Sequence, residues 1–148
     1  MSHATKINIL KYGSIFLIGF GLLNFLTLFP LADPVMQLFM NLAFLTGVGT
    51  EHLVSADAAR LWIAISGGLL AGWGVTLLLI TTQVYAPNPA LGRRIILSGI
   101  LTWFVVDSAG SIAAGAPFNA VLNLSFLALF ALPVAWPERN TTLSAHSA

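Results

Sequence analysis

Four polar residues in a largely apolar stretch have the types and spacing to act together: Asp107, Ser111, Asn119 and Asn123. A carboxylate can bind a cation or carry a proton, and amides and hydroxyls can hold it by hydrogen bonds. Asp107 and Ser111 are four residues apart, and so are Asn119 and Asn123. Residues four apart share one face of a helix. The spacing therefore predicts one polar stripe on each of two helices.

The two stripes meet if the helices form a tight hairpin around residues 115–117, Gly-Ala-Pro. Such a turn places Asp107 opposite Asn123. It also places Ser111 opposite Asn119. A carboxylate at the centre of a membrane helix costs about 2.5–3.5 kcal/mol. One charge-assisted hydrogen bond is worth about 1.5–3 kcal/mol. One or two amide donors would therefore offset most of the cost of keeping this carboxylate.

Two further polar residues complete the candidate cluster. Asn24 lies at a similar depth in the first apolar segment, and Arg60 enters the second from its far end and could reach toward Asp107. Two interpretations remain open. The cluster either lines a site for a small ligand, an ion or a proton, or it holds the membrane helices together, as Asn and Ser commonly do.

Other chemistries lack the residues they require. The chain has no cysteine, which removes thiol nucleophiles and thiolate metal sites. The apolar segments contain no histidine or lysine, which argues against a Ser-His hydrolase, His-ligated haem and a retinal Schiff base. Glu51, His52 and Asp57 match no metal motif. The net charge of +1 gives no attraction to nucleic acid. We expect neither an enzyme nor a cofactor or metal site.

The composition indicates that the polar residues above are carried by elements in contact with lipid. Of the 148 residues, 57% are hydrophobic and 7% are charged, whereas a soluble domain carries about 25% charged residues. Lipid must therefore cover much of the surface. Four apolar segments, at about 12–29, 58–82, 95–114 and 118–136, approach or exceed the ~20 residues that cross a bilayer. Unpaired backbone groups are not tolerated in hydrocarbon, so each is predicted to be helical. We expect an all-α integral membrane four-helix bundle, with residues 1–148 as a single domain.

A short fifth helix is predicted between the first two crossings. Asp33 and Pro34 are favoured residues for a helix start, and an apolar pattern continues to about residue 46. This helix, 34–46, is too short to span, so we expect it to lie on the outer membrane interface or against the bundle. Asp57 is the expected cap of the second crossing. The polar tail, residues 140–148, is expected to be disordered.

Basic residues predict the orientation of the chain. Lys6 and Lys11 lie in the expected N-terminal tail, Arg93 and Arg94 in the expected loop between the second and third crossings, and Arg139 in the C-terminal tail. Cytoplasmic segments carry an excess of lysine and arginine. Both termini are therefore expected to face the cytoplasm.

Gly68 and Gly72 form a small-xxx-small pair in the second crossing. Such a pair permits close approach of two helix backbones. We expect these two glycines to pack against another helix inside the bundle rather than to form a dimer contact.

The residues from Asp107 to Ser111, Asp-Ser-Ala-Gly-Ser, followed by Gly115, Asn119 and Asn123, resemble small uncharacterised bacterial membrane proteins of the BphX-like type. The resemblance covers mainly the last two helices. It implies a short multi-helix protein of a bacterial membrane, and it implies no established chemistry and no catalytic residue.

Two functional classes follow from the sequence. The first is a non-enzymatic component of the cell membrane, either an accessory subunit of a membrane complex or a binder of a small apolar molecule. The second is a small transporter or proton-coupled element in which Asp107 changes its charge. The expected partners are membrane lipid and either further copies of the chain or a larger membrane complex.

Overall fold

The computed structural model describes residues 1–29, 33–44 and 56–136, and all regular structure in these ranges is helical. The elements are α1 (His3–Leu26), α2 (Asp33–Ala43), α3 (Ala56–Leu79), the π-helix η2 (Ile80–Tyr85), α4 (Pro89–Ala113) and α5 (Pro117–Ala135). Four helical spans are long and apolar enough to cross a membrane: His3–Leu26, Ala59–Tyr85, Pro89–Ala113 and Pro117–Ala135. The all-helical class and the number of apolar spans agree with the sequence prediction.

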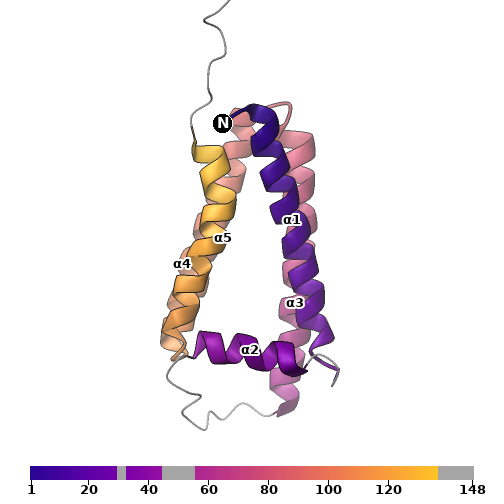
Figure 1. Cartoon of the computed structure of the whole chain (residues 1–148), viewed down its shortest axis with the longest axis vertical. Helices are drawn as coiled ribbons and strands as arrows, with labels where there is room; N and C mark the ends of the chain where they lie inside the picture. The colour runs from indigo at the N-terminus through magenta and orange to yellow at the C-terminus, as the bar shows by residue number, and fades with distance from the viewer. Residues whose placement is uncertain (30–32, 45–55, 137–148) are drawn as a thin grey trace, which may run out of the picture.

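The four long helices form two pairs (Figure 1). The most extensive helix contacts are those of α1 with α3 and of α4 with α5. The two pairs meet at the end of the molecule that carries the N-terminus and diverge toward the other end, where α2 lies crosswise (Figure 1). We call these the narrow end and the wide end. Helix α2 contacts α5, and its Phe39 ring lies 6.3 Å from that of Phe20 in α1. It therefore joins the two pairs at the wide end.

Three glycines let α1 and α3 approach closely. A Cβ atom on Gly67 would lie 2.8 Å from the backbone nitrogen of Phe25, and one on Gly74 would lie 2.7 Å from the Ile18 side chain. A Cβ on Gly21 would collide with the backbone of Ala71. Because real Cβ atoms do not approach this closely, each position requires glycine for the observed helix separation.

The prediction that Gly68 and Gly72 pack against another helix is wrong. A Cβ atom at either position would meet nothing within 4 Å in the described part of the chain. The contact face of α3 instead carries Gly67 and Gly74, which are seven residues, or about two helical turns, apart. Gly68 is rotated by about 100° from Gly67 and thus faces away from α1.

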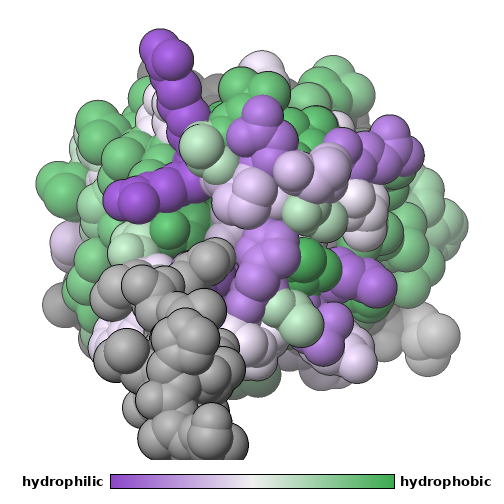
Figure 2. All heavy atoms as spheres, turned by 90° about the horizontal axis from the view of Figure 1, so that it is seen from above, coloured by the Kyte–Doolittle hydropathy of each residue, from purple (hydrophilic) through white to green (hydrophobic). Residues whose placement is uncertain are grey.

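The apolar core lies in the narrow half of the molecule. Its buried side chains come from all four long helices and from η2: Leu10, Leu17, Leu77, Tyr85, Ile96, Ile100, Phe130 and Val134. Many large apolar side chains on the outside of the helices are exposed, such as Leu69 at 69% and Val106 at 68%. Viewed from the narrow end, hydrophilic residues gather near the centre and hydrophobic residues surround them (Figure 2). This distribution suits helices whose sides face lipid and whose ends face water.

The first helix begins much earlier than predicted. The Ser2 hydroxyl accepts a hydrogen bond from the Thr5 backbone N–H at 3.1 Å and caps α1. Lys6 and Lys11 therefore lie in α1 rather than in a tail. Lys6 is only 3% exposed, and its Nζ donates to the backbone carbonyl of Trp136 at 2.7 Å. Hydropathy marks where an apolar segment starts, whereas capping decides where the helix starts, which explains the difference.

Helix α4 also begins earlier than predicted, again because of its cap. Asn88 caps α4 through a 3.1 Å hydrogen bond from the Leu91 backbone N–H, and Pro89 occupies the first turn. Arg93 and Arg94 consequently lie in the helix rather than in the predicted loop.

Several other predicted boundaries change or lie outside the described residues. Helix α2 ends at Ala43, before the predicted residue 46, and residues 45 and 46 lie outside the described ranges. Helix α3 begins at Ala56, so Asp57 is inside the helix rather than its cap. Glu51, His52 and the predicted disordered tail, residues 140–148, also lie outside the described ranges.

Candidate functional site

The turn between α4 and α5 sets the alignment of the polar residues. Gly115 has a positive φ of 79°, and its N–H donates to the Ile112 carbonyl at 3.1 Å. The Ala116 N–H donates to the Ser111 carbonyl at 2.9 Å. This pair of bonds is the Schellman motif, which ends a helix with a residue in the left-handed region. Pro117 then starts α5 directly. The two helices consequently run antiparallel from a fixed point.

The facing polar residues form a hydrogen-bonded network. Asn123 Nδ2 donates to Asp107 Oδ2 at 2.7 Å and to Ser108 Oγ at 3.2 Å. Asn119 Nδ2 donates to Ser111 Oγ at 2.8 Å and makes a longer contact of 3.4 Å with Asp107 Oδ2. Asp107 thus faces Asn123 and Ser111 faces Asn119, which are the pairings that the hairpin predicts.

Ser108 is a member of this network that the sequence analysis missed. Ser108 is 9% exposed and Asn123 is 5% exposed, so their hydrogen bond lies at the buried side of the hairpin. Ser108 precedes Ser111 by three residues, and residues three apart also share a helix face. This spacing was a usable signal that the stripe on α4 is wider than Asp107 and Ser111 alone.

Asn24 belongs to a second polar group, on the α1–α3 pair. Its Nδ2 donates to Ser66 Oγ at 3.0 Å, and Ser66 Oγ donates to the Ile63 carbonyl at 3.0 Å. Thr27 Oγ1 donates to the backbone carbonyl of Asn24 at 2.6 Å. Asn24 makes no hydrogen bond to Asp107, but both residues line the same cavity. Ser66 was not singled out from the sequence, where an isolated serine gives no such signal.

The prediction that Arg60 reaches toward Asp107 is wrong. Arg60 is exposed, and its Nη2 donates to the backbone carbonyl of Leu28 at 3.1 Å. Carbonyls just beyond the end of α1 lack helical partners, and a nearby cation is attracted to them. Arg60 therefore satisfies the end of α1, and its charge does not neutralise the carboxylate.

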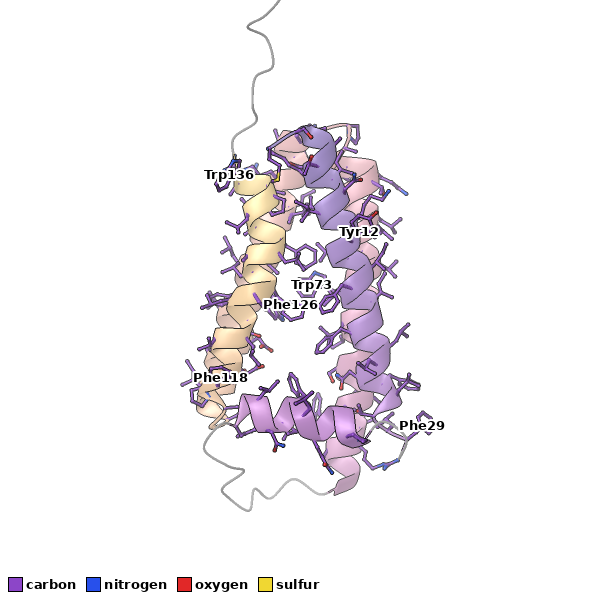
Figure 3. The ribbon with its side chains drawn as sticks, in the orientation of Figure 1. Tyr12, Phe29, Trp73, Phe118, Phe126 and Trp136 are labelled. Atoms are coloured by element: carbon purple, nitrogen blue, oxygen red, sulfur yellow. The ribbon has the colours of Figure 1, made fainter. Side chains whose placement is uncertain are left out.

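The two polar groups line one cavity of about 490 Å³ between the helix pairs. Most of its wall is aromatic or aliphatic. The Phe126 ring lies 5.9 Å from those of Phe20 and Trp103, measured between ring centroids. Phe126 points from α5 toward the space between the two pairs (Figure 3). The residues that line the cavity are Phe16, Leu17, Phe20, Leu23, Asn24, Thr27, Phe39, Ser66, Leu70, Trp103, Asp107, Asn119, Leu122, Asn123, Ser125 and Phe126.

Asp107 also borders two shallow, open surface hollows. One of about 680 Å³ lies beside Trp73 and Trp103, whose ring centroids are 5.5 Å apart. The other, of about 390 Å³, lies beside α2 and includes Ser111 and Asn119. The carboxylate is therefore at the junction of three spaces of different lining.

Comparisons with protein-family models, with curated proteins and with solved structures found no match to this chain.

Proposed function

We propose that this chain is a non-enzymatic, multi-pass protein of the bacterial inner membrane that binds a small apolar molecule in the cavity between its helix pairs. It acts alone, as a homo-oligomer or as an accessory subunit of a membrane complex. The observation that carries the proposal is the coincidence of an aromatic-walled cavity of about 490 Å³ with the polar cluster around Asp107. Ligand pockets typically measure about 300–1,000 Å³ and combine apolar walls with a few polar groups.

The extent of the polar lining favours a site over a purely structural role. The bonds from Asn119 and Asn123 to α4 already link the two helices of the α4–α5 hairpin. Asn24 and Ser66, on the opposite helix pair, make no hydrogen bond to that hairpin, yet they border the same space. Polar groups on opposite walls of an apolar cavity fit a bound molecule better than they fit helix-to-helix adhesion.

We further propose a four-helix bundle with both termini in the cytoplasm. Lys6 and Lys11 lie in the first turns of α1, and Arg93 and Arg94 lie in the first turns of α4. Both helices start at the narrow end (Figure 1). The excess of lysine and arginine on cytoplasmic segments supports a cytoplasmic narrow end.

Filling the cavity tests the binding proposal. Leu122→Trp adds a large side chain to the cavity wall, and we expect it to weaken binding of the neutral apolar dye N-phenyl-1-naphthylamine by about tenfold or more (~1.4 kcal/mol). Binding is measured by energy transfer from tryptophan to the dye, with the whole chain in lipid nanodiscs.

Leu132→Trp is the matched control, because Leu132 is on the same helix, is 55% exposed and is not part of the cavity wall. It adds the same chromophore and should bind the dye as the native chain does. Equal affinities for the two variants, or no saturable binding to the native chain, would contradict the proposed function.

The alternative function is a small transporter or proton-coupled element that uses Asp107. Its support is the position of this carboxylate, which borders both the cavity between the helix pairs and two open hollows on the surface. In that case transport or ligand binding in proteoliposomes depends on pH, and Asp107→Asn abolishes the dependence while the chain stays folded. A pH dependence that the variant retains would exclude a proton-carrying role for Asp107.

A further inference from the structure

The side-chain amides at the polar end of the cavity have fixed orientations. Asn123 faces the Asp107 carboxylate at 2.7 Å, and a carboxylate oxygen only accepts, so the NH₂ group of Asn123 must point to it. Asn119 places its NH₂ between Asp107 and Ser111 for the same reason. The Oδ1 atoms of both asparagines therefore point away from these bonds, and no described residue donates a hydrogen bond to either.

Asn24, on the opposite wall of the cavity, also has an amide whose orientation its hydrogen bond fixes. The Ser66 hydroxyl gives its proton to the Ile63 carbonyl, so Ser66 Oγ must accept from Asn24 Nδ2. The Oδ1 atom of Asn24 consequently remains an acceptor to which no described residue donates. Each of the three asparagines that line the cavity thus donates from Nδ2 to another side chain of the protein. Its Oδ1 atom accepts no hydrogen bond from a described residue.

The Asp107 carboxylate also has one oxygen atom to which no described residue donates. Both amide contacts of Asp107 go to Oδ2, and no described residue donates to Oδ1. Among the described residues that line the cavity, Asp107 is the only ionisable one. Arg60, the nearest candidate from the sequence, bonds to Leu28 instead. Within the described ranges, the residues that line the cavity therefore include one carboxyl group and several oxygen atoms to which no described residue donates, and they include no basic side chain.

From this polarity we infer that the ligand is an amphipathic amine, with a protonated amino group at Asp107 and one apolar body among the aromatic rings. This inference rests on the proposed function. An ammonium group brings several N–H donors and no acceptor, which is the complement of this polar end. It also brings the missing positive charge, and aromatic faces such as Phe20 and Phe126 attract cations. An alcohol supplies one donor and no charge, and a carboxylate ligand would be repelled.

Three compounds with the same body separate these possibilities: 4-phenylbutylamine, 4-phenylbutanol and 4-phenylbutanoate. Each displaces N-phenyl-1-naphthylamine from the whole chain at pH 7, in nanodiscs of zwitterionic lipid, so that membrane charge does not bias partitioning. We expect the amine to bind about tenfold or more tightly than the alcohol, a difference of ~1.4 kcal/mol. We expect the carboxylate to bind more weakly than the alcohol.

The variant Asp107→Asn tests whether the carboxylate causes the expected preference for the amine over the alcohol. The new amide can turn its carbonyl toward Asn123 and keep that hydrogen bond, so the fold should persist, which an unchanged circular dichroism spectrum verifies. We expect the variant to bind the amine as weakly as it binds the alcohol. A native chain that binds amine and alcohol alike, or a variant that keeps the amine preference, would overturn the inference and leave the binding function standing. If the dye binds saturably but none of the three compounds displaces it, the inference about the ligand also fails, whereas absence of dye binding would contradict the proposed site itself.

Discussion

Gly21→Ala and Gly74→Ala are each expected to lower the free energy of unfolding by about 1–3 kcal/mol, the range for overpacked interiors. A methyl group at Gly21 collides with the backbone of Ala71, and one at Gly74 would lie 2.8 Å from the backbone nitrogen of Ile18. Backbone atoms cannot rotate away as a flexible side chain can, so α1 and α3 must move apart. The loss extends along the contact, because these two helices share the most extensive interface in the described structure.

The measurement is unfolding by sodium dodecyl sulfate in mixed micelles, followed by circular dichroism. Gly68→Ala and Gly72→Ala are the matched controls, since a methyl group at either position meets nothing within 4 Å. Alanine is a better helix former than glycine by about 0.5–1 kcal/mol, so these controls should be neutral or slightly stabilising. If all four variants behaved alike, the assigned contact face of α3 would be wrong.

Asn123→Leu is expected to lower the free energy of unfolding by about 2–3 kcal/mol. It removes the 2.7 Å hydrogen bond to Asp107 and leaves the carboxylate with only the 3.4 Å contact from Asn119. Asp107 is partly buried, and leaving one partner of such a pair unsatisfied costs more than the bond itself contributes, whereas replacing both partners by apolar groups is often nearly neutral. The double variant Asp107→Leu/Asn123→Leu should therefore be more stable than Asn123→Leu alone.

The same unfolding assay completes a double-mutant cycle for the two residues. Asn8→Leu repeats the substitution at an exposed position of α1 and should change the stability by about 0.5 kcal/mol or less. Additive losses at Asp107 and Asn123 would show that the hydrogen bond between them contributes little to the fold.

The parts of the structure that depend on local sequence were predictable. The length of each apolar segment identified the four spans. The α4–α5 pairing followed from a glycine-containing turn and two pairs of polar residues spaced by four, because a short turn fixes the register of both helices at once. Asp107 and Asn123 could be placed opposite each other for this reason.

The parts that depend on how distant helices dock were not predictable. The glycines of α3 at positions 67, 68, 72 and 74 cover several faces of the helix, and the sequence does not say which face meets α1. Arg60 illustrates a related problem, since the carbonyl of Leu28 competes with Asp107 for its guanidinium and lies nearer. The cavity arises from the divergence of the two helix pairs, and no single segment encodes that divergence.

The unequal lengths of the spans link this divergence to the surrounding bilayer. The span Ala59–Tyr85 has 27 residues and is about 40 Å long, whereas Pro117–Ala135 has 19 residues and is about 28 Å long. The hydrocarbon layer is about 30 Å thick, so the short helix fits it nearly upright and the long one must tilt or extend into the headgroups. A change in bilayer thickness therefore acts differently on these two spans, which belong to different helix pairs. Hydrophobic mismatch would alter the angle between the pairs, and with it the width of the space that they enclose at the wide end.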